Sequence, residues 1–436
     1  MSETSIDEIV TEQAFTRSLS VQGEMFFRLA NSMLGLDHPG WSRRHLYQVV
    51  SEAHALESFL DDHGARDNRT FHQLRELVAS IRGLAQAGFC LRHLSGRLES
   101  YGVQATLSDE AGGAMEAAIV GARDFVEAGV GSLLKASREE AEAVGVRLPS
   151  DGFPSERYLP DSLRSRLPRN LGEEVIDEEA QRIAEVASKY LQVSEMFDGI
   201  GVRPLADPEA CERFLSQRCT EEQARVYEAT VHNLQSAYDT HIKNTVLEGE
   251  DDRLPRLRGH ASAALHLLEA VTLLAHFVER HEASDRQEGA VSRIDGLVSR
   301  REVRDLTLNA LLCWAQRLIE MGRPLAEDLL PSYTNVQELA VELEPGLVLH
   351  ARPMSLIVRI VGHHGTPVEM EVGGTVCNAG SIMDLMVAVG SNAASTEFRF
   401  RGDEHPLRDI GALFEHSLGE GGLSTLPDEL SYLRDS

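Results

Sequence analysis

The hydrophobic pattern of this 436-residue chain changes its period near residue 336, and this change constrains the fold more than any other feature. Before it, apolar residues recur every three or four positions, which is the spacing of helices that bury one face. After it, short segments such as Val368–Val372 alternate apolar and polar residues, as strands with one buried face do. The sequence therefore predicts a large all-α N-terminal region followed by a smaller α+β domain.

The helical spacing falls into two blocks, separated at 149–172 by a segment that contains four prolines. We interpret this segment as an ordered linker or crossover, because proline interrupts helices. The sequence thus predicts a helical bundle at 1–148 and a second at 173–335. The expected helices are 21–36, 45–63, 71–101, 110–144, 173–197, 210–246, 256–281 and 303–321.

Short segments of the two blocks match in the same order, which favours an internal duplication. Two pairs of histidines, His54 with His232 and His93 with His276, occupy matching positions. Chance similarity between amphipathic helices rich in Leu, Ala and Arg is the competing explanation. The matching segments are 24–26 with 195–197, 54–58 with 232–236, and 74–93 with 257–276.

Charge and cysteine content limit the classes of partner. The net charge of −27 argues against nucleic acid and against anionic membrane surfaces as general partners. The five cysteines are scattered and form no CxxC pair, and the histidines of the helical region form no metalloenzyme motif. The N-terminus is acidic and polar, and no apolar run reaches membrane-spanning length. We expect a soluble cytoplasmic protein without membrane insertion, metal or cofactor.

The segment 336–420 alternates strand and helix patterns in the order βαββαβα. We expect the first strand to reach 349, since 341–349 is apolar or alternating. Gly373-Gly374 predicts a hairpin turn, and Ser381 is well placed as the N-cap of the next helix. The remaining residues, 421–436, are expected to be a flexible or loosely docked tail.

The stretch 346–353 carries the residues with the clearest chemistry. Pro353 suits the first turn of a helix, so His350 is expected at or beside a helix N-terminus. Unpaired N–H groups and the helix dipole would hold an anion there, and Arg352 would add a charge-assisted hydrogen bond. A neutral imidazole is also available as a nucleophile near neutral pH.

The run Leu-His-Ala-Arg-Pro at 349–353 and the segment 378–386 resemble the two motifs of HPr, the histidine-containing phosphocarrier family of the phosphoenolpyruvate-dependent sugar phosphotransferase system. The resemblance extends over about 336–420 and implies an open-faced sandwich of four antiparallel strands. It implies that His350, assisted by Arg352, accepts a phosphoryl group from Enzyme I and passes it to an Enzyme II A protein. Ser381 would be a regulatory site for an HPr serine kinase, or a plain N-cap.

The resemblance also implies an apolar docking surface beside the histidine. Of its residues, we expect the side chains of Met354 and Met383 to be exposed to solvent. The chain departs from the family at Val348 and Asp384, where glycine is common, and at Gly380, where lysine is common. The expected docking residues are Met354, Ile382, Met383 and Met386.

Three functions remain open from the sequence. In the first, a phosphoryl carrier rather than a self-contained enzyme is fused behind a helical module that binds an unidentified regulatory partner or forms a homodimer. In the second, the HPr-like domain is degenerate and only docks, within a regulatory or scaffold protein. In the third, the helical module itself is an enzyme, although it carries no motif specific to a reaction.

Overall fold

The computed structural model describes residues 9–36, 41–154, 179–280 and 288–434. The chain divides into two compact units. Both units draw residues from the helical segment 173–335. The first comprises 1–170, 197–232 and 259–321, and the second comprises 171–196, 233–258 and 322–436.

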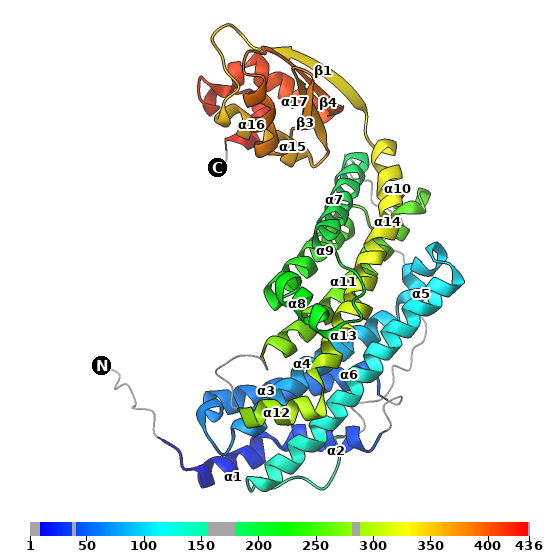
Figure 1. Ribbon diagram of the computed structural model, residues 1–436, viewed down its shortest axis with the longest axis vertical. Helices are drawn as coiled ribbons and strands as arrows, with labels where there is room; N and C mark the ends of the chain where they lie inside the picture. The colour runs from blue at the N-terminus through cyan, green and yellow to red at the C-terminus, as the bar shows by residue number, and fades with distance from the viewer. Residues whose placement is uncertain (1–8, 37–40, 155–178, 281–287, 435–436) are drawn as a thin grey trace. The chain divides into compact units, whose positions relative to one another are not determined.

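The region before residue 336 is helical, as the sequence predicts (Figure 1). A π-helix, Leu306–Leu312, joins the last two of its α-helices. The expected crossover at 149–172 lies mostly outside the described residues. The α-helices are α1 (Glu12–Gln22), α2 (Glu24–Leu34), α3 (Arg43–Asp62), α4 (His72–Ser95), α5 (Leu98–Tyr101), α6 (Asp109–Ala143), α7 (Glu179–Ile200), α8 (Pro208–Arg218), α9 (Glu221–His241), α10 (Val246–Glu250), α11 (Arg253–Arg280), α12 (Glu288–Leu297), α13 (Arg300–Asp305) and α14 (Cys313–Ser332).

Two expected helices are each divided in the structure. The predicted helix 71–101 ends at Ser95, with Gly96 as its C-cap residue, and the chain forms the short helix α5 from Leu98. The predicted helix 210–246 is interrupted after α8, where Thr220 caps the start of α9. In both cases a local cap ends the helix although the apolar spacing continues beyond it.

The helix α11 contains a long apolar window. By length and hydropathy it could cross a membrane, and among the described residues it is the one helix that meets both criteria. However, 78% of its most apolar window is buried against other parts of the chain. This burial is typical of a core helix.

The C-terminal part is a small α+β region with a four-stranded antiparallel sheet, and its elements follow the expected order βαββαβα. The strand order in the sheet is β1-β4-β2-β3. Gly373 and Gly374, with φ of 56° and 83°, form the predicted hairpin turn. The elements are β1 (Val336–Glu342), α15 (Ala351–His364), β2 (Val368–Val372), β3 (Thr375–Asn378), α16 (Ile382–Ser391), β4 (Glu397–Asp403) and α17 (Glu404–Glu415).

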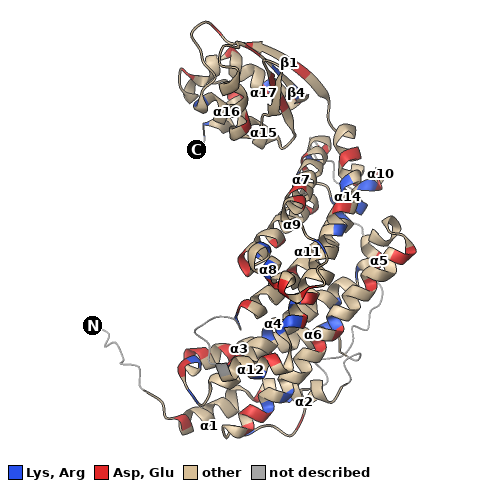
Figure 2. Cartoon of the chain, in the orientation of Figure 1, with Lys and Arg blue, Asp and Glu red and all other residues tan. Residues whose placement is uncertain are grey.

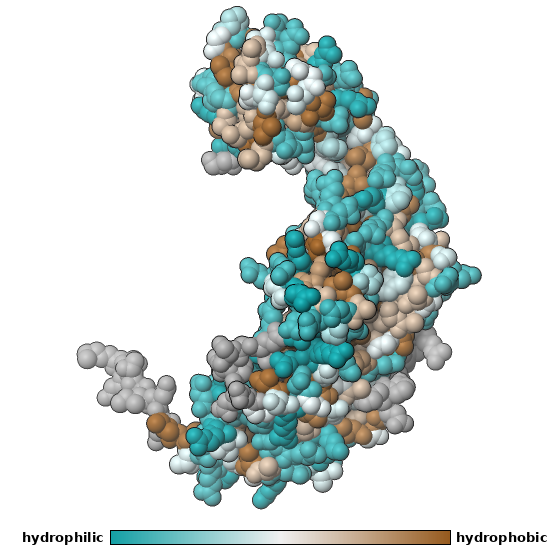
Figure 3. Space-filling model, in the orientation of Figure 1, coloured by the Kyte–Doolittle hydropathy of each residue, from teal (hydrophilic) through white to brown (hydrophobic). Residues whose placement is uncertain are grey.

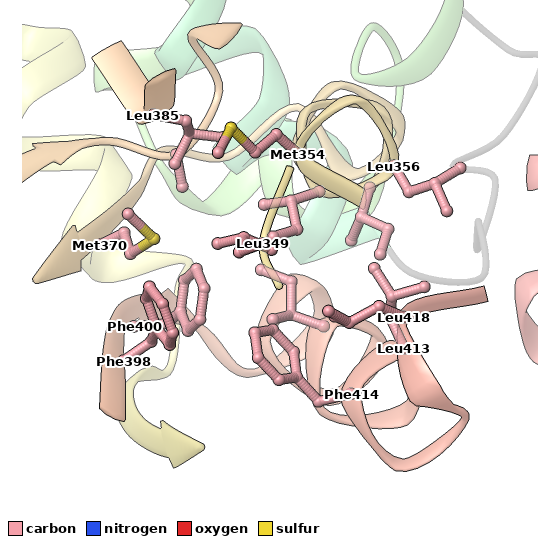
Figure 4. Close-up of a cluster of buried hydrophobic side chains, with 14 of the residues drawn as sticks. Leu349, Met354, Leu356, Met370, Leu385, Phe398, Phe400, Leu413, Phe414 and Leu418 are labelled. Carbon is pink, nitrogen blue, oxygen red and sulfur yellow. The ribbon is translucent and has the colours of Figure 1, made fainter. Parts of the chain in front are cut away.

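The sheet buries one face against α15 and α17. Alternate residues of β2 and β4 are buried, as the sequence pattern predicts. Figure 4 shows Phe398 and Phe400 of β4 and Phe414 of α17 in this core, with Leu349 between the sheet and the helices. The core therefore fixes the segment that leads into α15.

The expectation of a strand over 341–349 was wrong. The strand β1 ends at Glu342, and the chain turns at Glu344, where the Leu347 N–H donates to the Glu344 carbonyl at 3.0 Å. Pro345 cannot donate a ladder hydrogen bond, and Gly346 has a φ of 95° that favours glycine. Of the apolar residues that follow in this loop, Leu349 is buried and Val348 is exposed.

The expectation of a flexible or loosely docked tail was also wrong. Short 3₁₀ turns cover Leu423–Thr425 and Asp428–Leu433. Three leucines of this segment, Leu426, Leu430 and Leu433, are buried in the core of the α+β region. The described tail is therefore an integral part of this core.

Candidate functional site

His350 is the N-cap residue of α15, as the sequence predicts for the end of the loop before this helix. Its Nδ1 accepts the Arg352 N–H at 3.4 Å, and its side chain is 51% exposed. Leu349 is buried on one side and Pro353 on the other, so the backbone of the cap is anchored while the imidazole remains accessible. The ring thus sits at the end of the helix where the dipole favours an anion.

Glu420 contacts the other nitrogen of the same ring. Its Oε1 lies 3.0 Å from His350 Nε2. A left-handed turn after α17 brings Glu420 to this position, since Ser417, Leu418 and Gly419 have φ values of 54°, 57° and 72°. Such values are costly for residues other than glycine, and strained turns are common at functional sites.

The contact with Glu420 determines which nitrogen carries the proton. A carboxylate accepts hydrogen bonds and cannot donate, so the neutral imidazole holds its proton on Nε2. The lone pair then lies on Nδ1, on the side of the helix N-terminus. Sequence reasoning missed Glu420, because its approach to His350 depends on the packing of α17 and its turn.

Arg352 is exposed in the first turn of α15. Within the described part of the chain, no carboxylate pairs with its guanidinium. The side chain is therefore available for an anion near His350. The structure brings His350 and Arg352 together on one helix terminus, as their spacing predicts.

Ser381 caps α16, and its Oγ accepts the Asp384 N–H at 3.3 Å. The N-cap interpretation of Ser381 is confirmed by this bond. The Gly380 N–H donates a hydrogen bond to Asn378 Oδ1 at 2.8 Å. Val348, two residues before His350, is 65% exposed.

The expected docking residues divide into a buried and an exposed group. Met383 and Met386 are 65% and 48% exposed, and Val387 on the same helix is 64% exposed. Ile382 is half-buried against the core. The expectation that Met354 is at the surface was wrong: it is 4% exposed and extends toward Leu385 in Figure 4.

Met354 is buried because its position in α15 faces α16. The helical spacing places it on the same face as Ile357 and Val361, which are also core residues. A flexible thioether fills the space between the two helices. The exposed apolar residues of α16 are Met383, Met386 and Val387, which we call the α16 patch.

Residues at matching positions of the two helical blocks form the same kind of arginine–aspartate ion pair. Arg75 Nε and Nη2 each donate to Asp61 at 2.6 Å. Arg258 Nε and Nη2 donate to Asp239 at 2.6 and 3.0 Å. Each aspartate stands three positions after its matching segment, 54–58 or 232–236, so both pairs occupy equivalent places.

The helices α3 and α9 also begin in the same way. Ser42 Oγ accepts the His45 N–H, and His45 Nδ1 accepts the Ser42 N–H. Thr220 Oγ1 accepts the Gln223 N–H, and Gln223 Oε1 accepts the Thr220 N–H. Each is a reciprocal capping box. In both helices the N-cap residue precedes the matched aspartate by the same number of positions.

The matched histidines differ in their partners. His276 Nδ1 contacts Glu221, the first residue of α9, at 2.6 Å. His93 Nδ1 contacts Arg43, the first residue of α3. Burial lowers the pKa of His93 to about 4, with further lowering from His266 and Arg43. The other matched pair, His54 and His232, is exposed. No group of three metal-ligating side chains occurs among the residues that the structure describes.

Charged residues of both signs are spread over the chain (Figure 2), and the face in Figure 3 is largely hydrophilic with scattered apolar residues. Comparisons with protein-family models, curated proteins and solved structures found no match to this chain. The resemblance to HPr, which depends on the motifs at 349–353 and 378–386, therefore stays a prediction.

Proposed function

We propose that the α+β region is an HPr-type phosphocarrier domain of the phosphoenolpyruvate-dependent sugar phosphotransferase system. The observation that supports this most is the arrangement of His350: an exposed N-cap imidazole, held at Nε2 by Glu420, with Nδ1 at the start of α15. The order of strands and helices supports the finer assignment of the fold to the open-faced sandwich of HPr.

The transfer would begin with attack of the Nδ1 lone pair on the phosphorus of the phosphohistidine of Enzyme I. The new N–P bond forms on His350 as the N–P bond of the donor breaks, and the proton on Nε2 remains shared with Glu420. The attack would break the hydrogen bond from the Arg352 N–H to Nδ1, and this amide and the Arg352 guanidinium would then receive the phosphoryl oxygens. The reverse steps would pass the group to an Enzyme II A protein.

The α16 patch would dock these partners. Three apolar side chains, at Met383, Met386 and Val387, are exposed on one short helix that packs against α15. An exposed apolar group beside a reactive histidine favours a protein partner, because transfer needs the two imidazoles to approach closely. Ser381 at the start of this helix is where an HPr serine kinase would modify the surface.

The helical region would serve as a regulatory module of a cytoplasmic protein, through a partner or a homodimer. The equivalent pairs Arg75–Asp61 and Arg258–Asp239, together with the two capping boxes, support an origin by duplication of one helical bundle. A duplicated scaffold with no reaction-specific motif is suited to binding rather than to catalysis.

The test is incubation of the full chain with Enzyme I and radiolabelled phosphoenolpyruvate. The expected result is one acid-labile phosphoryl group per chain, absent from His350→Ala. The control His416→Ala removes another exposed imidazole of the same region and should leave labelling unchanged. If Enzyme I binds the chain without labelling it, the domain is a docking module instead, and the carrier function is excluded.

A further inference from the structure

A cavity of about 240 Å³ lies within the first unit, between α8, α11 and the π-helix. Its volume corresponds to about eight waters, which suits a small ligand. The π-helix Leu306–Leu312 contributes Thr307 to the wall. Short π-helices are rare and occur often at functional sites, because the wider turn displaces side chains from the regular helical positions.

One side of the cavity is apolar. Leu215 of α8 and two residues of α11, Ala275 and Val278, line it. Cys219 adds a buried thiol, whose pKa is raised to about 12 by burial and by Glu279, so it carries no charge at neutral pH. This wall suits an aliphatic or aromatic group of a few carbon atoms.

The other side carries both signs of charge. The Arg304 guanidinium is 15% exposed and lies 3.6 Å from Glu212. The carboxylate of Glu279 accepts the Glu221 N–H at 2.7 Å, which fixes its position at the start of α9. A purely anionic ligand would face two carboxylates, and a purely cationic ligand would face the half-buried guanidinium.

We propose that this cavity binds a free α-amino acid with an apolar side chain. The ligand carboxylate would pair with Arg304, its ammonium would lie near Glu279 and Glu212, and its side chain would contact Ala275 and Val278. A zwitterion with an apolar group is the ligand class that complements both signs of charge and the apolar residues at this volume. The helical region would thus be a metabolite sensor, independently of whether His350 carries a phosphoryl group.

The ligand test uses isothermal titration calorimetry of the full chain with L-leucine, L-isoleucine, L-valine, L-methionine and L-phenylalanine. Two analogues of leucine each lack one charge: 3-methylbutylamine lacks the carboxylate and 4-methylpentanoate lacks the ammonium. We expect at least one amino acid to bind, with both of its one-charge analogues weaker by about tenfold or more. Absence of binding by all five amino acids, or equal binding of an analogue, would overturn the proposal.

Variants of Arg304 and Glu279 test separately how each of the two ligand charges contributes to binding. Arg304→Gln should lose the advantage of leucine over 3-methylbutylamine, and Glu279→Gln should lose its advantage over 4-methylpentanoate while keeping an acceptor for the Glu221 N–H. Ala275→Leu should abolish binding by filling the cavity. The matched control is Arg213→Gln, an exposed arginine of α8 outside the cavity wall. If Arg304→Gln fails to fold, the comparison of leucine with its two analogues on the unmodified chain still tests the proposal.

Discussion

The carboxylate of Glu420 lies 3.0 Å from Nε2 of His350 and so assigns the two nitrogens of this imidazole different tasks. Nε2 holds the proton, and Nδ1 presents a lone pair at the N-terminus of α15. The carboxylate thereby orients the ring and would stabilise the positive charge that develops when Nδ1 is phosphorylated. The first prediction follows from this contact.

Glu420→Ala should slow phosphorylation of His350 by Enzyme I by about tenfold or more, because the ring loses its orienting acceptor. Glu420→Gln should restore part of the rate, since the amide oxygen still accepts a hydrogen bond from Nε2. The measurement is the initial rate of labelling, with Glu415→Ala as the control for a nearby exposed glutamate. An unchanged rate in Glu420→Ala would remove Glu420 from the mechanism.

The α16 patch predicts a separation of binding from chemistry. Met383→Glu and Met386→Glu should each raise the KM for labelling by Enzyme I by about tenfold and leave kcat nearly unchanged, because they place a charge in the apolar contact. Val336→Glu, at an exposed position of β1, is the matched control. Equal effects of all three variants would mean that the patch is not the docking surface.

The attachment of the C-terminal segment predicts a loss of stability in acid. Burial raises the pKa of Asp409, but hydrogen bonds from His364 and Tyr432 outweigh it and hold the pKa below its ordinary value. A depressed carboxyl pKa stabilises the fold above the unfolded pKa of about 3.9 and loses that effect as pH falls through the folded pKa. Asp409→Asn should therefore lower stability at pH 7 and flatten its dependence on pH below about 4.

Thermal unfolding of the full chain between pH 3 and pH 7 measures this effect. Tyr432→Phe removes one donor and should give an intermediate result. If Asp409→Asn unfolds with the same pH dependence as the unmodified chain, the hydrogen bonds to Asp409 do not hold the segment.

Arg75 should be the most sensitive arginine of the helical region. Its side chain is 8% exposed, and it lies within 3.5 Å of carboxylates from Glu57, Asp61 and Glu76. Arg75→Ala should cost about 3–5 kcal/mol, because it removes the cation closest to the buried carboxylate of Glu76, which then has the more distant Arg280 at 3.4 Å. Arg258→Ala, at the matching and more exposed position, should cost less. Urea unfolding followed by circular dichroism measures both, and equal costs would contradict the role of burial.

The sequence predicted the features that depend on local pattern. The alternation of apolar and polar residues along 368–372, followed by two glycines, was sufficient to predict the hairpin. Ser381 caps α16 because its hydroxyl oxygen accepts a hydrogen bond from the amide three residues further on. His350 was placed at its helix terminus for the same reason. These features require no knowledge of distant contacts.

Features that depend on tertiary packing were not predicted. The loop after β1 carries apolar residues as a strand does, since Leu343 and Leu349 are buried in the core. Its apolar pattern therefore gave no sign of the turn that follows Glu344. Met354 could not be assigned to the core rather than the surface without the position of α16. Glu420 reaches His350 through a left-handed turn that no sequence period reveals.

The central claim is that Nδ1 of His350 carries the phosphoryl group, and its most direct test is the position of the label. After loading by Enzyme I and phosphoenolpyruvate, mass spectrometry should place one phosphoryl group on His350, and nitrogen-15 NMR should show that it is bonded to Nδ1. Absence of a label, or a label on another residue or on Nε2, would contradict the account.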